Sequence, residues 1–168
     1  MKKVILYIAM SLDGFIASKD NSVEWLDKYN NSGESFGYTK FYDSIDTVVL
    51  GNTTYAQFPD AYQEKECYVF SRTKKGKHKK STYINSTPKE FLAKLSDQNK
   101  NIWLVGGANL TNQFLKENLI DEMIISIMPS FLGEGVRLFR DDNLELSFKL
   151  INSKSYDCGV VQVHYKKL

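Results

Sequence analysis

Short apolar runs alternate with amphipathic segments along the chain. Each apolar run is bounded by polar residues, which predicts a buried strand. The segments between them repeat apolar residues at helical spacing, which predicts helices or helical turns. The predicted strands are 3–10, 47–50, 66–70, 81–85, 102–105 and 121–128, and the predicted helical segments are 21–29, 34–45, 51–55, 87–95 and 110–119.

The order of these elements predicts an α/β fold. Strands that alternate with helices favour a mostly parallel central sheet with helices on both faces. Segments 144–156 and 160–166 alternate enough to predict a C-terminal antiparallel hairpin around Asp157-Cys158-Gly159. With 168 residues, of which 42% are hydrophobic, the chain is expected to form a single domain, 1–168.

Composition favours a cytoplasmic protein. No apolar run has the length that spans a bilayer, and the N-terminal run is followed by an acidic turn instead of a cleavage site. Cys67 and Cys158 stand far apart in strand-like runs, so we expect reduced core thiols. His164 is predicted to be exposed and His78 lies in a basic loop. Neither has a partner for a catalytic dyad or a metal cluster, so no metal is expected.

Positive charge is concentrated in one segment. The net charge is only +2, yet six Lys and Arg residues fall within 72–80. The rest of the chain is therefore mildly acidic, whereas a nucleic-acid-binding protein needs positive charge spread over a face. We expect no nucleic-acid partner, and the segment is either a solvated loop or an anion-binding element.

Glycine and hydroxyl residues follow three predicted strands. Gly106-Gly107 precedes a helix, whose first N–H groups and positive dipole end suit a phosphate, although a simple tight turn is the alternative. Gly51-Asn52-Thr53-Thr54 repeats this theme. Ser71-Arg72-Thr73 offers a guanidinium that can bind a phosphate monoester through two hydrogen bonds.

These three corners are expected at one edge of the sheet. Parallel α/β sheets bind ligands at the carboxyl ends of their strands. Three phosphate-compatible corners there indicate a dinucleotide with an additional phosphate, which is NADP. The G-x-G-x-x-G fingerprint is absent, so the usual Rossmann binding unit is not expected.

Other polar residues are expected at the same edge. Asp13, just past the first strand, either pins a turn through backbone N–H groups or faces a pocket, beside Ser11. Ser126 is either a satisfied core serine or a ligand contact. Glu134 lies between two glycines in a late loop.

Five motifs together resemble the dihydrofolate-reductase-like superfamily. Within it, the chain is most similar to the RibD C-terminal domain family, the reductase domain of bacterial riboflavin biosynthesis, and to stand-alone relatives of that domain. The resemblance covers nearly the whole chain, and its most specific parts are the Gly-Gly corner and the LDGFIA turn. The motifs are SLDGFIA (11–17), VVLGNTTY (48–55), VFSRT (69–73), WLVGGANLTNQFL (103–115) and PSFLGEGVRLF (129–139).

The resemblance implies NADP(H) as the cofactor. Segment 106–110 would hold the pyrophosphate, 51–54 would form the second cofactor loop, and Ala9 and Ile16 would hold the nicotinamide carboxamide. Folate reductases commonly carry Arg where Asn52 stands, so recognition of the 2'-phosphate would depend on Arg72 and the neighbouring Lys74. The implied cofactor contacts are Ala9, Ile16, Gly51, Asn52, Thr53, Thr54, Ser71, Arg72, Thr73, Val105, Gly106, Gly107, Ala108, Asn109 and Leu110.

The substrate side departs from the folate reductases. Their first-helix carboxylate would fall near Tyr29 by its spacing from Ile16, and Asp27 is only nearby, which argues against a true folate reductase. Asp13, Glu134 or bound water would supply the proton. The expected substrate contacts are Ser11, Trp25, Phe41, Ser126 and Phe131.

The sequence thus indicates an NADPH-dependent reductase of a small heterocyclic or sugar-derived substrate, similar to 5-amino-6-(5-phosphoribosylamino)uracil reductase. The alternatives are a dihydrofolate or pteridine reductase and a non-catalytic NADP-binding module. The resemblance also implies a homodimer.

Overall fold

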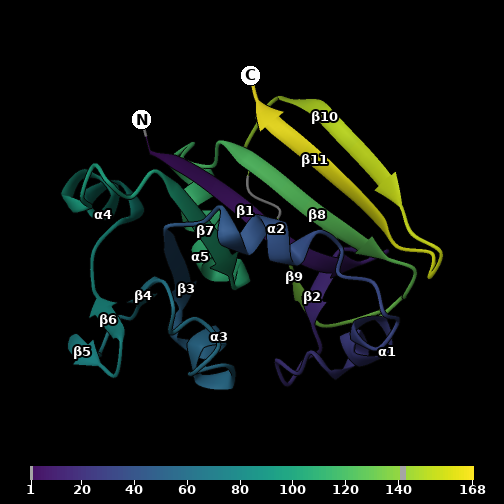
Figure 1. The fold of residues 1–168 in the computed structure, drawn as a ribbon, viewed down its shortest axis with the longest axis horizontal. Helices are drawn as coiled ribbons and strands as arrows, with labels where there is room; N and C mark the ends of the chain where they lie inside the picture. Colours follow the sequence, from purple (N-terminus) through teal and green to yellow (C-terminus); the bar gives the residue numbers. More distant parts are fainter. Residues whose placement is uncertain (1, 141–142) are drawn as a thin grey trace.

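The computed structural model describes residues 2–140 and 143–168. Within these residues, a nine-stranded sheet has the order β10-β11-β8-β1-β7-β3-β4-β6-β5, and β2 pairs with β9 in a small second sheet (Figure 1). The strands are β1 (Lys3–Ser11), β2 (Phe15–Ala17), β3 (Thr47–Gly51), β4 (Glu66–Phe70), β5 (Gly76–His78), β6 (Ser81–Ile84), β7 (Asn101–Gly106), β8 (Glu122–Met128), β9 (Val136–Arg137), β10 (Phe148–Ser155) and β11 (Val161–Lys167). The helices are η1 (Glu24–Leu26), α1 (Asp27–Asn30), α2 (Tyr38–Asp43), α3 (Asn52–Gln57), α4 (Pro88–Lys94) and α5 (Ala108–Lys116).

The centre of the main sheet is parallel. β8, β1, β7, β3, β4 and β6 all run in the same direction. The hairpin β10–β11 adds an antiparallel pair beside β8, and β5 adds an antiparallel strand at the opposite edge. The predicted α/β fold with a C-terminal hairpin is confirmed.

One face of the sheet is covered by α4 and α5. Val4 and Leu6 of β1 alternate with Ile5, so they point to the same face. There they join the core cluster that contains Phe91 of α4 and Phe114 of α5, and Phe114 is fully buried. The apolar stripes of the two helices therefore hold this layer on the sheet.

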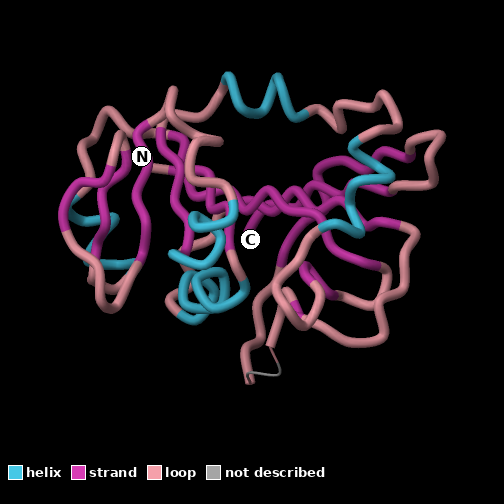
Figure 2. Tube along the Cα trace, turned by 90° about the horizontal axis from the view of Figure 1, so that it is seen from below, coloured by secondary structure: helices cyan, strands magenta, loops and turns pink. Residues whose placement is uncertain are grey.

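The opposite face is covered by α1, α2 and α3, so helices lie on both sides of the strands (Figure 2). Phe41 of α2 stacks on Tyr7 of β1, with ring centroids 4.3 Å apart, and both rings lie edge-on to Trp103. Tyr55 of α3 belongs to the same buried cluster. This aromatic packing fixes α2 and α3 against the strands.

Some predicted element boundaries are wrong. The helix predicted over 34–45 is limited to α2, because Gly37 at its start and Phe36 before it both have positive φ angles. The helix predicted over 21–29 is replaced by the short helices η1 and α1. The hairpin strand predicted from 144 begins at Phe148.

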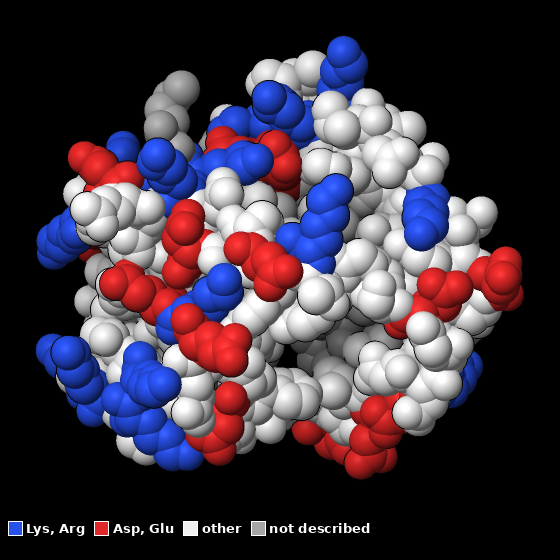
Figure 3. Space-filling model, in the orientation of Figure 1, with Lys and Arg blue, Asp and Glu red and all other residues white. Residues whose placement is uncertain are grey.

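The basic segment 72–80 contains an unpredicted strand, β5, and makes a blue patch over β5 and β6 (Figure 3). Lys79 pairs with Asp60 at 2.6 Å, and Lys74 lies 5.3 Å from the centre of the Tyr83 ring. His78 Nδ1 lies 3.3 Å from Tyr55 Oη. The segment therefore supplies the outer strand of an edge hairpin with β6, and three of its side chains contact neighbouring residues.

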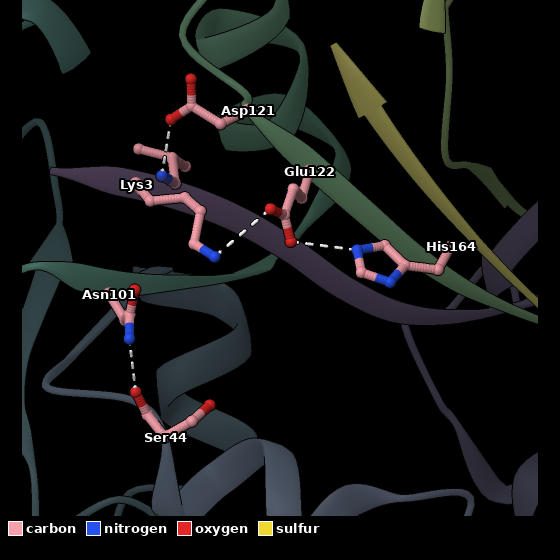
Figure 4. Close-up of polar contacts among 7 residues, drawn as sticks. Lys3, Ser44, Asn101, Asp121, Glu122 and His164 are labelled. Atoms are coloured by element: carbon pink, nitrogen blue, oxygen red, sulfur yellow. Dashed lines mark hydrogen bonds and ion pairs between the residues drawn. The ribbon is translucent and has the colours of Figure 1, made fainter. Parts of the chain in front are cut away.

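The prediction that His164 is exposed is also wrong, because its side chain is half-buried. Strands β1, β8 and β11 lie side by side, which places His164 Nε2 3.0 Å from Glu122 Oε2 and Lys3 Nζ 3.3 Å from Glu122 Oε1 (Figure 4). Burial favours a higher pKa for Glu122, but the hydrogen bonds from His164 and Lys3 outweigh it and lower that pKa.

None of the described helices has the length and apolar character needed to cross a membrane.

Candidate functional site

A cavity of about 1010 Å³ lies at the carboxyl ends of the parallel strands. Ala9 of β1, Val105 of β7, Gly51 of β3, Phe70 of β4 and Ile84 of β6 all line it, so each strand of the parallel centre except β8 contributes. The surface is hollowed between α1 and α3 in Figure 3. The site is therefore at the sheet edge where α/β folds bind ligands.

Two glycine corners approach each other in this cavity. A Cβ atom on Gly107 would lie 3.4 Å from Thr54 Oγ1, and one on Gly51 would lie 3.8 Å from Gly107 N. Among the described residues, no side chain caps the start of α5. Its first N–H groups thus remain available to an anion at the positive end of the helix dipole.

Asn52, beside these corners, has an unsatisfied side chain. Its Oδ1 is buried without a hydrogen-bond partner among the described residues, and Asn52 lines the cavity. A buried polar atom without a partner is uncommon in native proteins. A ligand with hydrogen-bond donors in the cavity would satisfy it.

The ends of β4 and β6 form the far wall of the cavity. Arg72 and Thr73 line it together with Asn85 and Ser86. Asn85 Nδ2 donates to the Arg72 carbonyl at 3.1 Å, and Ser71 Oγ accepts from Lys74 N at 3.0 Å. These bonds hold the turn that presents the Arg72 guanidinium.

The predicted cofactor residues all line this cavity except Gly106, which is buried. Gly106 has φ +115°, and a Cβ atom there would contact Ile8 at 3.4 Å. The three predicted corners, at Gly51, Ser71 and Gly107, are far apart in the sequence but line one cavity. They lie at the ends of β3, β4 and β7, which are neighbours in the sheet.

The carboxylates predicted to be catalytic do not line the cavity. Asp13 accepts hydrogen bonds from Ser11 Oγ at 2.6 Å, Leu132 N at 3.1 Å and Gly133 N at 2.7 Å. Desolvation favours a higher pKa for Asp13, but these hydrogen bonds together lower it. Asp13 therefore pins the 130–133 turn as a carboxylate.

Glu134 also lies outside the cavity. Its Oε2 pairs with Lys19 Nζ at 2.5 Å, and both side chains are exposed. The contact joins the loop before β9 to the loop after β2.

The five predicted substrate residues lie outside the cavity as well. Ser11 is fully buried and accepts from Phe15 N at 2.9 Å, while Ser126 is bonded to Gln162 Nε2 at 2.9 Å. Ser126 thus has the satisfied core environment that was its alternative, and Ser11 is likewise a buried serine with hydrogen-bond partners. The three aromatic residues are accounted for by packing or exposure: Phe41 lies in the aromatic cluster, Trp25 packs near Tyr29 and Tyr156, and Phe131 is 76% exposed.

The first helical segment contributes different residues. Leu26, Asp27 and Asn30 line the cavity, whereas Tyr29 is buried and its hydroxyl lies 2.7 Å from Ser130 Oγ. Asp27 and Asn30 are three residues apart, so they share one face of the turn. Tyr29 is buried and does not line the cavity. The three-residue spacing of the polar residues Asp27 and Asn30 is therefore the signal in the sequence that could identify them.

Two arginines after β8 also line the cavity, and the sequence pattern gave no signal for them. Arg137 belongs to β9, and its guanidinium carbon lies 4.8 Å from the centre of the Phe15 ring. Arg140 donates through its guanidinium to Asn109 Oδ1. Asn112 Oδ1 accepts from Arg140 N at 3.3 Å and fixes this backbone to α5.

A side-chain hydrogen bond joins two residues of the cavity lining. Gln57 of α3 and Asn21 both line the cavity, and Gln57 Nε2 donates to the Asn21 carbonyl at 2.9 Å. The loop between β2 and η1 is thereby held next to α3.

Comparisons with known proteins identify the family. The sequence model of the RibD C-terminal domain matches residues 2–162. The chain is 42% identical to the uncharacterized protein YwjB of Bacillus subtilis (strain 168), over 98% of this chain and 97% of that protein.

Solved structures share the fold. A protein of Shewanella sp. PV-4, provisionally named a riboflavin biosynthesis protein, is 30% identical with a TM-score of 0.88 over 99% of both chains. The diaminohydroxyphosphoribosylaminopyrimidine deaminase/5-amino-6-(5-phosphoribosylamino)uracil reductase of Thermotoga maritima is 16% identical with a TM-score of 0.77, over 99% of this chain and 57% of that one.

Proposed function

The chain belongs to the RibD C-terminal domain family, and on this premise we propose that it is an NADPH-dependent reductase similar to 5-amino-6-(5-phosphoribosylamino)uracil reductase. The observation that carries the proposal is the convergence of the Gly51 and Gly107 corners and Arg72 on one cavity.

The residues present fit NADP(H). The glycine corners leave the space that Cβ atoms would take, the start of α5 has free N–H groups, and Asn52 Oδ1 has no partner among the described residues. Arg72, on the wall built by β4 and β6, suits a phosphate monoester. The diphosphate would lie at Gly107–Leu110 and Gly51–Thr54, and the 2'-phosphate at Arg72.

When bound, NADPH supplies a hydride from C4 of its nicotinamide to an electrophilic carbon of the substrate, and a proton completes the reduction. Ala9 and Ile16, at the end of β1 and in β2, would hold the nicotinamide end. Asp27 is the carboxylate that lines the cavity among the described residues. It would orient the substrate and, directly or through water, supply the proton.

Binding and turnover test this proposal separately. We expect NADPH to raise the melting temperature more than NADH at equal concentration. We also expect absorbance at 340 nm to fall when 5-amino-6-(5-phosphoribosylamino)uracil is added with NADPH. NADPH binding without turnover of any tested substrate would favour a non-catalytic NADP-binding module, and absence of NADPH binding would contradict the proposal.

A dihydrofolate or dihydropteridine reductase is the second candidate. It is favoured by Asp27, a carboxylate of the first helical segment that lines the cavity, although spacing from Ile16 predicts the folate-reductase carboxylate near Tyr29. The same absorbance assay with dihydrofolate decides between the two. Faster turnover of dihydrofolate than of the pyrimidine would favour this candidate.

A further inference from the structure

The charges that line the cavity are unbalanced. Among the described residues, Arg72, Lys116, Arg137 and Arg140 line it, against the single carboxylate of Asp27. A low-dielectric cleft lined mainly by charges of one sign favours ligands of the opposite sign. The cavity therefore suits anionic ligands.

The proposed cofactor accounts for part of this positive charge. Arg72 lies where the 2'-phosphate would bind, and Arg140 is bonded to the Asn109 side chain in the first turn of α5, next to the diphosphate corner. Arg137 belongs to neither corner.

Arg137 is held in place without being neutralised. In the β2–β9 sheet, Arg137 is paired with Phe15, and its guanidinium stacks on that ring at 4.8 Å. No hydrogen bond or ion pair engages this guanidinium within residues 2–140 and 143–168. A stacked arginine retains its donors while losing conformational freedom, so it is prepared to bind an anion.

The position of Arg137 points to the substrate end of the cavity. Its neighbour Val136 is paired with Ala17, and Ile16, Ala17 and Val136 line the cavity. Gly135 makes this close pairing possible, since a Cβ atom there would lie 2.2 Å from the Ala17 carbonyl oxygen. Ile16 is also where the nicotinamide end would lie.

We propose that Arg137 is a specificity-determining residue that binds an anionic group, a phosphate or a carboxylate, on the substrate. This inference rests on the proposed function for the placement of the cofactor. A guanidinium can bind either anion through two parallel hydrogen bonds. Asp27 and Arg137 would then bind opposite features of the substrate, a hydrogen-bond donor and an anion.

Binding to the NADP⁺-loaded protein, measured by calorimetry, tests the inference without turnover. Two ligand pairs separate the sources of the anion: ribose 5-phosphate against ribose, and folate against 6-methylpterin. We expect wild type to prefer the anionic member of one pair by at least about tenfold. We expect Arg137→Met to lose that preference, and Arg137→Lys to recover part of it.

Two controls complete the experiment. Lys149→Met removes an exposed charge on β10 and should keep the wild-type preference. An unchanged NADP⁺ dissociation constant shows that the cavity is intact in Arg137→Met, and Arg137→Gln replaces this variant if it does not fold.

Equal preference in wild type and Arg137→Met would overturn the inference, as would a wild type without preference in either pair. Should the protein fail to bind NADP⁺, the same titrations are made without it. A retained, Arg137-dependent preference would then support the anion site while contradicting the proposed cofactor.

Discussion

Arg72 is the residue expected to distinguish NADPH from NADH. It lines the cavity wall, and the Asn85 side chain bonds to its carbonyl. Arg72→Ala should reduce the ratio of NADH to NADPH dissociation constants by roughly 10- to 100-fold, because a charge-assisted hydrogen bond to phosphate is lost. Fluorescence titration of both cofactors measures the ratio.

Lys75→Ala is the matched control for Arg72→Ala. It removes a neighbouring positive charge that does not line the cavity. An unchanged ratio in Arg72→Ala would remove the assignment of this residue to the 2'-phosphate.

Glu122 gives a pH-dependent prediction at the opposite end of β1. Hydrogen bonds from His164 and Lys3 outweigh desolvation and lower its pKa, so the unfolded chain binds the proton more readily than the folded protein. Its stabilising contribution is therefore present above the unfolded pKa of about 4.3 and is lost as pH falls through the lower folded pKa.

Glu122→Gln should thus lower the free energy of unfolding by about 1 kcal/mol at pH 7. The difference from wild type should shrink below about pH 4. Urea unfolding of wild type and variant at pH 7 and below about pH 4 measures this difference. Glu145→Gln, which changes an exposed carboxylate, is the control. A difference that stays constant with pH would exclude ionisation of Glu122 as its cause.

At the scale of elements, Gly135 governs the pairing of β2 with β9. It has φ +146°, and a Cβ atom would lie 2.2 Å from the Ala17 oxygen. Gly135→Ala should therefore destabilise the protein by roughly 2 kcal/mol and weaken ligand binding near Arg137. Thermal unfolding and the titrations above measure both effects.

Gly33→Ala separates backbone strain from collision. Gly33 also has a positive φ, +81°, but nothing lies within 4 Å of a Cβ atom there. If Gly33→Ala loses as much stability as Gly135→Ala, the collision with the Ala17 oxygen of β2 contributes nothing to the destabilisation.

Elements with a strong local pattern were predictable. The strand predicted at 66–70 coincides with β4. The helix predicted over 87–95 contains α4, which begins with a capping box in which Thr87 and Glu90 bond to each other's backbone N–H groups. These signals lie within a few residues, so no tertiary information is needed.

Elements that depend on distant partners were not predictable. The two residues of β9 become a strand only because β2, more than a hundred residues earlier, lies beside them. For the same reason no signal in the sequence indicates that Arg137 lines the cavity, whereas the glycine corners that line it are visible locally. The sequence leaves Asp13 open between pinning a turn and supplying a proton, because the partners that hold its carboxylate, Leu132 and Gly133, are also distant.

At the scale of the whole molecule, the cavity has one wall from the parallel centre of the main sheet and one wall from elements outside it. The wall formed by β3, β4 and β7, with the Gly51 and Gly107 corners, is carried by the parallel centre of the sheet. The opposite wall is built from α1, β2 and β9, which lie outside that centre (Figure 1). Changes in α1 and β9 can therefore alter the preferred substrate without altering the corners proposed to hold the diphosphate.

Homodimerisation, expected from the family resemblance, belongs to the same scale. β10 forms an edge of the main sheet and exposes Leu150 by 48% and Ile151 by 50%. Apolar side chains on an unpaired edge strand favour association with another chain.

We predict that wild type is a dimer by light scattering at micromolar concentration, and that the double change Leu150→Lys and Ile151→Lys makes it a monomer. Leu12→Lys, at a 67% exposed leucine away from this edge, should stay dimeric. A monomeric wild type would contradict the expectation, and a dimeric double variant would exclude this edge as the interface.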